Sequence, residues 1–358
     1  MNTSNSRPPA LLPVIGPAWY GSVMGTGILS NLLQLHHEHI PFAHFFAVIL
    51  MFAAWILLIG LSAGFIYRIF TVPHSFAATI TQHGSVPAWG MVAMGILATA
   101  SATAGVLPTI ITISHDTLEY LYATMWIIGT TIGLLSTVGF SCLLISKDCD
   151  SPVPSWGLAV VPPMVSSTTG GTLVSLIESL PLRFLVDVIC AGCFFTSLAL
   201  GGIIFITAYF HVWRRTPLPL AARPTAWIPL GVVGQSAAAA QSMAMQTKGR
   251  FLMPAVHEVA QRTADVYSAV ILTIGIPLFL WAMYITYRGF KMNMPYSPAW
   301  WAMTFPVGTC CLGTFFLGQN SWGWIMYVSV ALTLFLVCTW SIAAFGTINA
   351  LRHKKISA

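Results

Sequence analysis

The chain has 358 residues and a formal net charge of +6, with 56% of its residues apolar and only 7% charged. Soluble domains carry roughly 25% charged residues, so this composition excludes a water-soluble fold and indicates that lipid surrounds most of the protein. We therefore expect one membrane domain in contact with membrane lipid, with no cofactor and no nucleic-acid partner.

Ten apolar runs along the chain are long enough to form membrane-crossing helices. About 20 apolar residues are needed to span the ~30 Å hydrocarbon core of a bilayer. In chain order the predicted spans cover residues 14–34, 42–66, 86–106, 118–145, 153–177, 182–212, 226–247, 263–287, 298–318 and 322–350. No small-residue cleavage site follows the first run, so we interpret it as a helix and not as a signal peptide. The start of the eighth span is the least defined, because Glu258, Arg262 and Asp265 lie there.

Lysine and arginine lie mainly on one side of these spans. The side that holds both termini and the even-numbered loops carries eleven: Arg7, Arg68, Lys147, Arg214, Arg215, Arg223, Arg288, Lys291, Arg352, Lys354 and Lys355. The opposite side carries four: Arg183, Lys248, Arg250 and Arg262. Cytoplasmic loops hold the excess of basic residues, which predicts cytoplasmic termini and agrees with an even number of spans. We expect a multi-pass protein of the cell (plasma or inner) membrane, with tails at 1–13 and 351–358 and one membrane domain at 14–350.

A proline followed by a tryptophan opens each odd-numbered span. The signature occurs at Pro17-Ala18-Trp19, Pro87-Ala88-Trp89, Pro154-Ser155-Trp156, Pro224-Thr225-Ala226-Trp227 and Pro298-Ala299-Trp300. Proline suits a first helical turn, where its missing N–H costs no hydrogen bond, and tryptophan suits the membrane interface. The tryptophans are 70, 67, 71 and 73 residues apart, about the length of two membrane helices with short loops. We therefore predict five tandem helical hairpins, at about 14–66, 86–145, 153–212, 226–287 and 298–350.

The odd-numbered spans differ in composition from the even-numbered ones. They are rich in glycine, hydroxyl residues and proline, as in Ser166-Ser167-Thr168-Thr169-Gly170-Gly171, whereas the even-numbered spans are bulkier, as in Leu334-Phe335-Leu336. Kinked, polar backbone is tolerated in a membrane only where it faces protein or a water-filled cavity. We predict an all-α ring of five hairpins in which the odd-numbered helices line a central pore. The alternative, that small residues only tighten helix packing, explains the glycines but explains the hydroxyls and paired prolines less well.

Candidate residues along this pore come from the odd-numbered spans. They are Gly25, Thr26, Gly27, Gly95, Pro162, Pro163, Gly231, Gly234, Gln235, Thr304, Gly308 and Thr309. The odd-numbered spans carry no charged residue, which argues against coupling through an intramembrane carboxylate and against a cationic site that would hold a dianion tightly. Hydroxyl donors such as Thr26 and Thr304, with exposed N–H groups at kinks, suit a weakly held monovalent anion.

Several of these segments resemble the tellurite-resistance/dicarboxylate transporter family, which includes the slow anion channels of plant guard cells. The most specific is Trp300-Trp301-Ala302-Met303-Thr304-Phe305-Pro306, which is similar to the W-W-x-x-T-F-P segment of the family's ninth helix. Met24-Gly25-Thr26-Gly27 and Val161-Pro162-Pro163-Met164 also match family patterns. The resemblance covers nearly the whole chain. It implies five hairpins in a ring around an uncharged pore, a homotrimer, and a phenylalanine that plugs the pore, carried over to Phe305.

Within this family the choice of anion stays open among three hypotheses. The stretch Pro229-Leu230-Gly231-Val232-Val233-Gly234-Gln235 resembles the P-L-G-x-x-G-Q of fungal sulfite-efflux pumps more than the malate permeases, and the Phe305-Pro306-x-Gly308 run favours the same group. Sulfite or bisulfite efflux is therefore the first hypothesis. Transport of C4-dicarboxylates such as malate is the second, and a chloride/nitrate-type anion channel is the third.

An intramembrane enzyme is the alternative from another class, and we do not expect it. Such an enzyme needs a metal, a nucleophile or a carboxylate pair at membrane depth, and only the histidines are candidates. His36, His37, His39 and His44 form a cluster with Glu38 in the first outward loop, which we interpret as a solvated loop without a metal. All seven cysteines, including the Cys190-x-x-Cys193 pair, are interpreted as packing residues.

Overall fold

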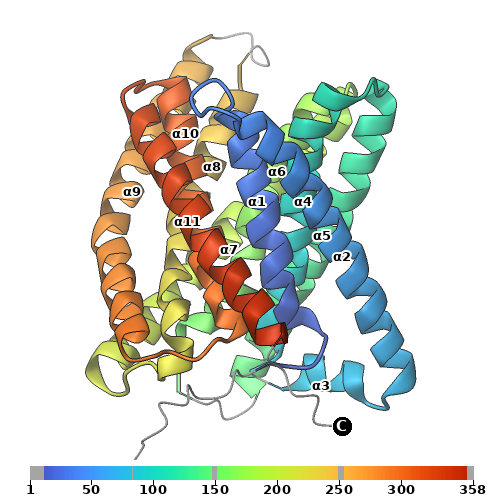
Figure 1. Cartoon of the computed structure of the whole chain (residues 1–358). Helices are drawn as coiled ribbons and strands as arrows, with labels where there is room; N and C mark the ends of the chain where they lie inside the picture. Colours follow the sequence, from blue (N-terminus) through green and yellow to red (C-terminus); the bar gives the residue numbers. More distant parts are fainter. Residues whose placement is uncertain (1–11, 83, 147–150, 249–253, 353–358) are drawn as a thin grey trace, which may run out of the picture.

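The fold is built from helices that run side by side along the length of the molecule (Figure 1). The computed structural model describes residues 12–82, 84–146, 151–248 and 254–352, and over these ranges it contains helices and no β-strand. The prediction of an all-α fold is therefore confirmed. Most of both predicted tails lies outside the described ranges, together with Cys149 and several of the basic residues used to predict orientation: Arg7, Lys147, Arg250, Lys354 and Lys355.

Two groups of helices alternate along the chain. The first group corresponds to the odd-numbered predicted spans and comprises α1 (Gly21–Leu35), α4 (Trp89–Ile110), α6 (Pro162–Leu176), α8 (Pro229–Gln246) and α10 (Phe305–Asn320). The second group is longer and comprises α2 (Ala43–Thr71), α5 (His115–Ser146), α7 (Leu180–Arg214), α9 (Pro254–Lys291) and α11 (Ile325–Arg352). A short helix that the sequence did not predict, α3 (Ser75–Thr81), lies in the loop between α2 and α4.

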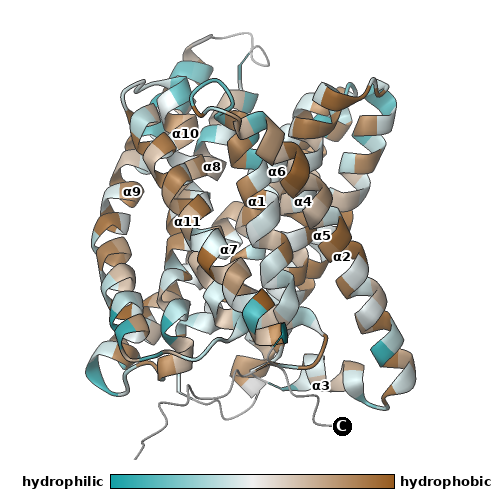
Figure 2. Ribbon diagram, in the orientation of Figure 1, coloured by the Kyte–Doolittle hydropathy of each residue, from teal (hydrophilic) through white to brown (hydrophobic). Residues whose placement is uncertain are grey.

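Burial separates the two groups into an inner and an outer layer. In the most apolar window of Pro298–Asn320, which contains α10, 94% of the positions are buried, against 17% in that of Ala255–Lys291 in α9. The exposed positions of the second group carry large apolar side chains, such as Phe52, Ile56 and Ile59 on α2. Figure 2 shows hydrophobic residues along α2, α9 and α11 and hydrophilic residues gathered towards the ends of the bundle. Apolar surface of this extent calls for contact with lipid, so the second group is the lipid-facing layer.

Seven helical segments in the described part of the chain are long and apolar enough to cross a membrane. They are Ala43–Thr71, Val86–Ile110, His115–Ile145, Leu180–Arg214, Ala255–Lys291, Pro298–Asn320 and Ile325–Arg352. The protein is therefore a multi-pass membrane protein. The segments predicted as the other three spans form α1 and α6, with 15 residues each, and α8, with 18. These helices are shorter or more polar than a lipid-facing span because other helices surround them, so their side chains do not have to match the hydrocarbon.

The proline–tryptophan signature forms a 3₁₀ turn before each inner helix. These turns are η1 (Pro17–Tyr20), η2 (Val86–Ala88), η3 (Pro154–Ala159), η4 (Leu220–Trp227) and η5 (Pro298–Met303). The inner α-helices consequently begin later than the predicted spans, for example at Gly21 and at Phe305. Proline favours such an entry because its missing N–H would have no partner there. The first turn is further anchored by Trp19, whose Nε1–H donates to the Pro13 carbonyl at 3.1 Å.

The eighth predicted span begins earlier than expected, because α9 starts at Pro254 and not at 263. The carboxylate of Asp265 does not end the helix, since neighbouring polar side chains satisfy it. Gln241 Nε2 on α8 donates to Asp265 Oδ1 at 2.8 Å, and Gln261 Nε2 donates to the same oxygen at 2.9 Å. Ser321 Oγ, just after α10, donates to Asp265 Oδ2 at 2.6 Å. A buried or half-buried charge is stable when hydrogen bonds of this kind replace water.

Helices that are neighbours in the sequence contact one another, and the first inner helix also contacts the last. Each inner helix packs against the outer helix that follows it: α1 with α2, α4 with α5, α6 with α7, α8 with α9, and α10 with α11. The inner helices contact one another in the order α1–α4, α4–α6, α6–α8, α8–α10 and α10–α1. The main hydrophobic cluster draws residues from all five inner helices. The first and last inner helices, far apart in the sequence, therefore meet in the interior.

Candidate functional site

The thirteen residues predicted to line the pore or to plug it are all buried. They lie on the inner helices or in the turns that lead into them, so none of them faces lipid. An open, water-filled channel would leave its lining side chains accessible to water. Any passage along these residues is therefore closed in this structure.

Phe305, the predicted plug, is the first residue of α10. The chain changes there from the 3₁₀ turn η5 to an α-helix. The next residue, Pro306, has no backbone N–H and so leaves no unpaired donor at the start of the helix. The Phe305 side chain is 3% exposed and belongs to the main hydrophobic cluster. Its ring is thus held inside the protein at the beginning of an inner helix.

Gly25 and Thr304 come together where α1 crosses the start of α10. A Cβ atom at Gly25 would lie 2.4 Å from Thr304 Oγ1, so only glycine permits this approach. The hydroxyl of Thr304 donates to the Trp301 carbonyl at 2.7 Å and so closes the preceding turn. One turn further along α10, a Cβ atom at Gly308 would lie 2.8 Å from Ile28 Cδ1 on α1. Three predicted pore residues therefore form the contact between the first and last inner helices.

Gly234 and Thr309 form the corresponding contact between α8 and α10. A Cβ atom at Gly234 would lie 2.2 Å from the backbone nitrogen of Cys310. Thr309 Oγ1 donates to the Leu230 carbonyl on α8 at 3.2 Å and to the Pro306 carbonyl at 2.7 Å. The glycine lets the two backbones approach, and the threonine then joins them with a hydrogen bond.

The remaining predicted residues on α1 and α4 also make helix contacts. A Cβ atom at Gly27 would lie 2.9 Å from the Ala98 carbonyl carbon on α4, and one at Gly95 would lie 3.3 Å from Val23 on α1. Thr26 Oγ1 accepts a hydrogen bond from Trp340 Nε1 on α11 at 3.0 Å. Packing, the alternative explanation for the small residues, thus accounts for these glycines, and Thr26 points towards an outer helix. A pathway role for these residues stays a prediction.

The paired prolines begin α6, directly after Val161. Pro162 and Pro163 occupy the first two positions of the helix, where missing N–H groups leave no hydrogen bond unmade. Pro162 also faces two neighbouring elements, because a Cβ atom at Gly90 would lie 3.0 Å from its Cγ and one at Gly133 would lie 2.9 Å from its Cβ. Pro162 therefore packs α6 against α4 and α5.

Gln235 on α8 is the polar side chain that packing explains least. It is 2% exposed, yet its Oε1 atom has no hydrogen-bond partner among the described residues. A buried acceptor left in this state costs about 1–3 kcal/mol, which favours a functional use of the amide. Gly231 lies one turn earlier on the same helical face. A Cβ atom there would meet only Val161 Cγ1 at 3.7 Å, so this face of α8 has more room than the contact at Gly234.

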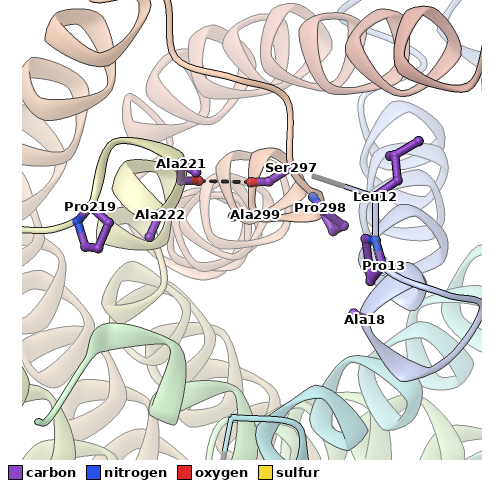
Figure 3. Close-up of a pocket in the computed structure, with 9 residues that line it drawn as sticks. All are labelled: Leu12, Pro13, Ala18, Pro219, Ala221, Ala222, Ser297, Pro298 and Ala299. Atoms are coloured by element: carbon purple, nitrogen blue, oxygen red, sulfur yellow. Dashed lines mark hydrogen bonds between the residues drawn. The ribbon is translucent and has the colours of Figure 1, made fainter. Parts of the chain in front are cut away.

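A pocket of about 690 Å³ opens at the end of the bundle where α1, α8 and α10 begin (Figure 3). It is lined by Leu12, Pro13, Ala18, Pro219, Ala221, Ala222, Ser297, Pro298 and Ala299. Three separate turns meet around it, and Ser297 Oγ joins two of them by donating to the Ala221 carbonyl at 2.9 Å. The nine lining residues carry no charge. We call this pocket the mouth. The sequence analysis missed it, although the repeated proline–tryptophan signature marks the turns that enclose it.

The histidine cluster does not form a single solvated loop, and this corrects the prediction for His36. His36 is fully buried, whereas His37, Glu38 and His39 are exposed. Ser329 Oγ donates its proton to the Cys311 carbonyl at 2.8 Å, so it accepts at 2.9 Å from His36 Nε2, which must carry the imidazole proton. The Nδ1 atom then has no partner among the described residues. Burial, assisted by nearby His39, lowers the pKa of His36 from 6.5 to about 4.

The described ranges contain no group of three histidine, cysteine or acidic side chains close enough together to hold a metal ion. Cys190 and Cys193 are both buried thiols of α7, and the Cys190 thiol points at the Ser166 carbonyl, 3.9 Å away. Cys190 therefore packs α7 against α6, and Cys193 is buried one turn further along α7, which agrees with the interpretation of both as packing residues.

Comparison with known proteins finds relatives over the whole helical bundle. A family model described as voltage-dependent anion channel matches residues 15–348. The chain is 22% identical over 348 residues to the sulfite efflux pump SSU1 of Arthroderma otae, a match that covers 90% of this chain and 91% of that protein. It is 21% identical over 313 residues to the sulfite efflux pump SSU1 of Trichophyton rubrum, covering 85% and 82%. It is also 23% identical over 350 residues to an uncharacterized transporter of Methanocaldococcus jannaschii, covering 93% of each chain.

Proposed function

We propose that this chain, which belongs to the voltage-dependent anion channel family, conducts small monovalent anions across a cell membrane. Membership rests on a match that extends from residue 15 to residue 348, and it confirms the resemblance predicted from the sequence. The family and the relatives named above are channels and transporters. The proposal adds the route, the gate and the preferred anion.

The route we propose runs along an axis enclosed by α1, α4, α6, α8 and α10. The closed order of contacts among these helices, together with their burial, supports a ring with the outer helices on its lipid-facing side. In this arrangement α1, α6 and α8 also cross the membrane, each lengthened by the turn before it, which gives ten crossings. An even number of crossings puts both termini on one side, and the excess of basic residues there favours the cytoplasm.

The absence of charge along this route is the observation that carries the proposal. The inner helices and their entry turns contain no lysine, arginine, aspartate or glutamate, apart from Arg223 in η4. A lining without carboxylates lacks the usual groups for proton or cation coupling, and one without cations releases a bound anion readily. In the proposed ring all five inner helices start at the end of the bundle that contains the mouth. Each helix start carries about half a positive charge from its peptide dipoles, so together they attract anions to this end.

Phe305 is the gate that we propose for the route. Its burial at the start of α10 and the inaccessibility of the other predicted lining residues support a closed state. Opening would then require the phenyl ring to move or the inner helices to separate. Gln235 is the polar group that we propose to contact the permeating anion. Its buried amide carries two N–H donors, and its Oε1 acceptor has no partner among the described residues, so no hydrogen bond to that oxygen fixes the orientation of the amide.

Bisulfite, the monovalent form of sulfite, is the anion that we propose first. Two of the relatives named above are sulfite efflux pumps that match most of this chain, and the Pro229–Gln235 stretch resembles the same group. A C4-dicarboxylate such as malate fits less well, because a dianion gains more from fixed cations than the inner helices provide. The family description favours a chloride/nitrate-type channel as the second candidate.

Anion flux into proteoliposomes tests this proposal. Purified protein and its Phe305→Ala variant are reconstituted, and uptake of sulfite, malate, chloride and nitrate is measured against empty liposomes. We expect sulfite uptake above the empty control and malate uptake close to it. Malate uptake without sulfite uptake would establish the dicarboxylate alternative, and chloride or nitrate uptake faster than sulfite would establish the channel alternative. If neither protein moves any of the four anions, the transport proposal is wrong.

We propose a homotrimer in the cell membrane as the assembled form, as the family resemblance implies. Native mass spectrometry of the protein in mild detergent would give the mass of the assembly directly. A single-chain or two-chain mass would exclude the trimer. The orientation is tested separately, by labelling cysteines introduced at the exposed positions Thr216, on the mouth side, and Ser175, on the opposite side, with a reagent that does not cross the membrane.

A further inference from the structure

A second pocket lies at the end of the bundle opposite the mouth. It has a volume of about 750 Å³ and is lined by Val174, Ser175, Leu180, Arg183, Phe184, Asp187, Met243, Met245, Gln246, Thr247 and Lys248. These residues come from the last turn of α6, the first turns of α7, and the end of α8 with the two residues that follow it. The mouth contains the turn before α8, so the two pockets lie at opposite ends of that helix.

This pocket lies on the lipid-facing side of the inner layer, away from the proposed axis. Its wall includes Met243, which packs with Phe194 of α7 and Tyr267 of α9 in a small cluster outside the main core. Phe184, at its rim, is 70% exposed, and Leu180 is 69% exposed. Exposed apolar side chains at the rim of a pocket in a membrane protein contact the acyl chains of lipid.

Two cationic side chains converge on the pocket. Of the four basic residues predicted for this side, Arg250 lies outside the described ranges, and Arg262 forms an ion pair with Glu258 at 2.6 Å. The other two, Arg183 and Lys248, both line this pocket.

Further polar groups stand beside these cations. The Nε–H of Arg183 donates to the Ile177 carbonyl, which fixes the guanidinium at the wall and leaves the Nη atoms with the donor geometry that suits a phosphate. The hydroxyls of Ser175 and Thr247 add donors of the kind that phosphate oxygens accept. Asp187 also lines the pocket and is itself engaged by another group.

The depth of the pocket in the membrane points to the same kind of ligand. Helix α7 has 35 residues and is about 52 Å long, which exceeds the ~30 Å hydrocarbon core. Its first two turns carry the charged residues Arg183 and Asp187, which are costly in hydrocarbon, so these turns lie in the headgroup layer, where the phosphates of lipids lie. We propose that Arg183 and Lys248 bind the phosphate of a phospholipid headgroup in this pocket, with its acyl chains along the exposed face of α7.

Lipid binding by the purified full-length protein tests this inference. Native mass spectrometry in mild detergent would compare phosphatidylglycerol with a diacylglycerol of the same chains, which has no phosphate. The variants are Arg183→Gln combined with Lys248→Gln, and Arg262→Gln as a control that removes a charge on the same side outside the pocket. A basic residue near the membrane surface contributes about one kcal/mol to such binding, so we expect the double variant to bind phosphatidylglycerol about 30-fold more weakly. The control should bind it as the wild type does.

Three results would overturn the inference. The first is equal binding of phosphatidylglycerol by the double variant and the wild type. The second is equal binding of the diacylglycerol and phosphatidylglycerol by the wild type, which would assign the pocket to acyl chains alone. The third is stabilisation of the wild type, but not of the double variant, by inorganic phosphate to the same extent as by the lipid, which would assign it to a free anion. Anion flux of the double variant, measured in proteoliposomes of one fixed composition, reports separately on folding and on the proposed transport.

Discussion

Replacing Gly234 with alanine tests the contact that brings α8 and α10 together. The added Cβ atom would lie 2.2 Å from the backbone nitrogen of Cys310 and 2.3 Å from the carbonyl carbon of Thr309. Both atoms are backbone atoms, so no side-chain rotation relieves the clash. Ordinary contact begins near 3.4 Å, and 3.4 − 2.2 = 1.2, so the two helices must separate locally by about 1.2 Å.

The free energy of unfolding should fall by about 1–3 kcal/mol. Inserting one methyl group into a tightly packed contact costs typically 1–3 kcal/mol. The separation also stretches the hydrogen bond from Thr309 Oγ1 to the Leu230 carbonyl, now 3.2 Å, which contributes about 0.5–1.5 kcal/mol. Alanine gains up to about 1 kcal/mol over glycine inside a helix, which offsets a part of this loss.

Gly231→Ala is the matched control, one turn earlier on the same helix. A Cβ atom there meets only Val161 Cγ1, at 3.7 Å, so the variant receives the helix-propensity gain without a clash. Unfolding of both variants in mixed detergent micelles would give the difference between them, which we expect to be about 2–4 kcal/mol. If Gly234→Ala proves as stable as Gly231→Ala, the close approach of α8 to α10 is wrong.

Three further changes test the gate, the interior amide and the buried histidine. Phe305→Ala should raise anion conductance because it removes the proposed plug. Phe194→Ala, which also removes a buried phenyl ring but lies on α7, should leave conductance unchanged. Equal conductance of the two variants would show that Phe305 is not the gate. Gln235→Leu should keep the melting temperature of the protein, since it removes an unpartnered acceptor. It should lower anion flux at least about tenfold, because it removes a hydrogen bond to a charged ligand. An unchanged flux would contradict a contact between Gln235 and the anion. The pKa of His36 is about 4 in the folded protein and returns to about 6.5 in the unfolded chain. Between these two pH values the unfolded chain binds more protons than the folded one. The free energy of unfolding should therefore fall as the pH drops from about 6.5 to about 4. His36→Gln should flatten this dependence of the melting temperature on pH, whereas His37→Gln, at an exposed position, should retain it.

Local composition was sufficient to predict the layers of this protein. An apolar stretch such as Ala43–Thr71, with large side chains on its outer face, can be stable only beside lipid, and this follows from its residues alone. The small and hydroxyl residues of α4 and α10 mark helices enclosed by other helices, as their burial bears out. The repeated proline and tryptophan likewise predicted where each inner helix is entered, because both preferences are local.

The rotation of each inner helix could not be predicted in this way. Gly27 and Gly231 look alike in the sequence, yet the first packs against the α4 backbone and the second has room beside it. Thr26 binds Trp340, more than 300 residues away in the chain. Which face of a helix meets a neighbour depends on close contacts between distant segments, and composition carries no record of them.

The hydrogen-bond partners of charged and polar groups near the helix ends could not be predicted either. Glu258, Arg262 and Asp265 made the start of the eighth span hard to predict. The partners of Asp265, on α8 and just after α10, are brought beside it only in the folded chain, whereas Arg262 and Glu258 pair with each other on α9. The sequence around His36 is typical of a solvated loop, and only the folded chain places Ser329 and Cys311 beside it. Local composition by itself determined which helices meet lipid and which meet protein, since bulky apolar side chains suit lipid and small or hydroxyl side chains suit contact with other helices. Only tertiary contact decided which polar atoms are satisfied, since a hydrogen bond requires two groups to be brought together.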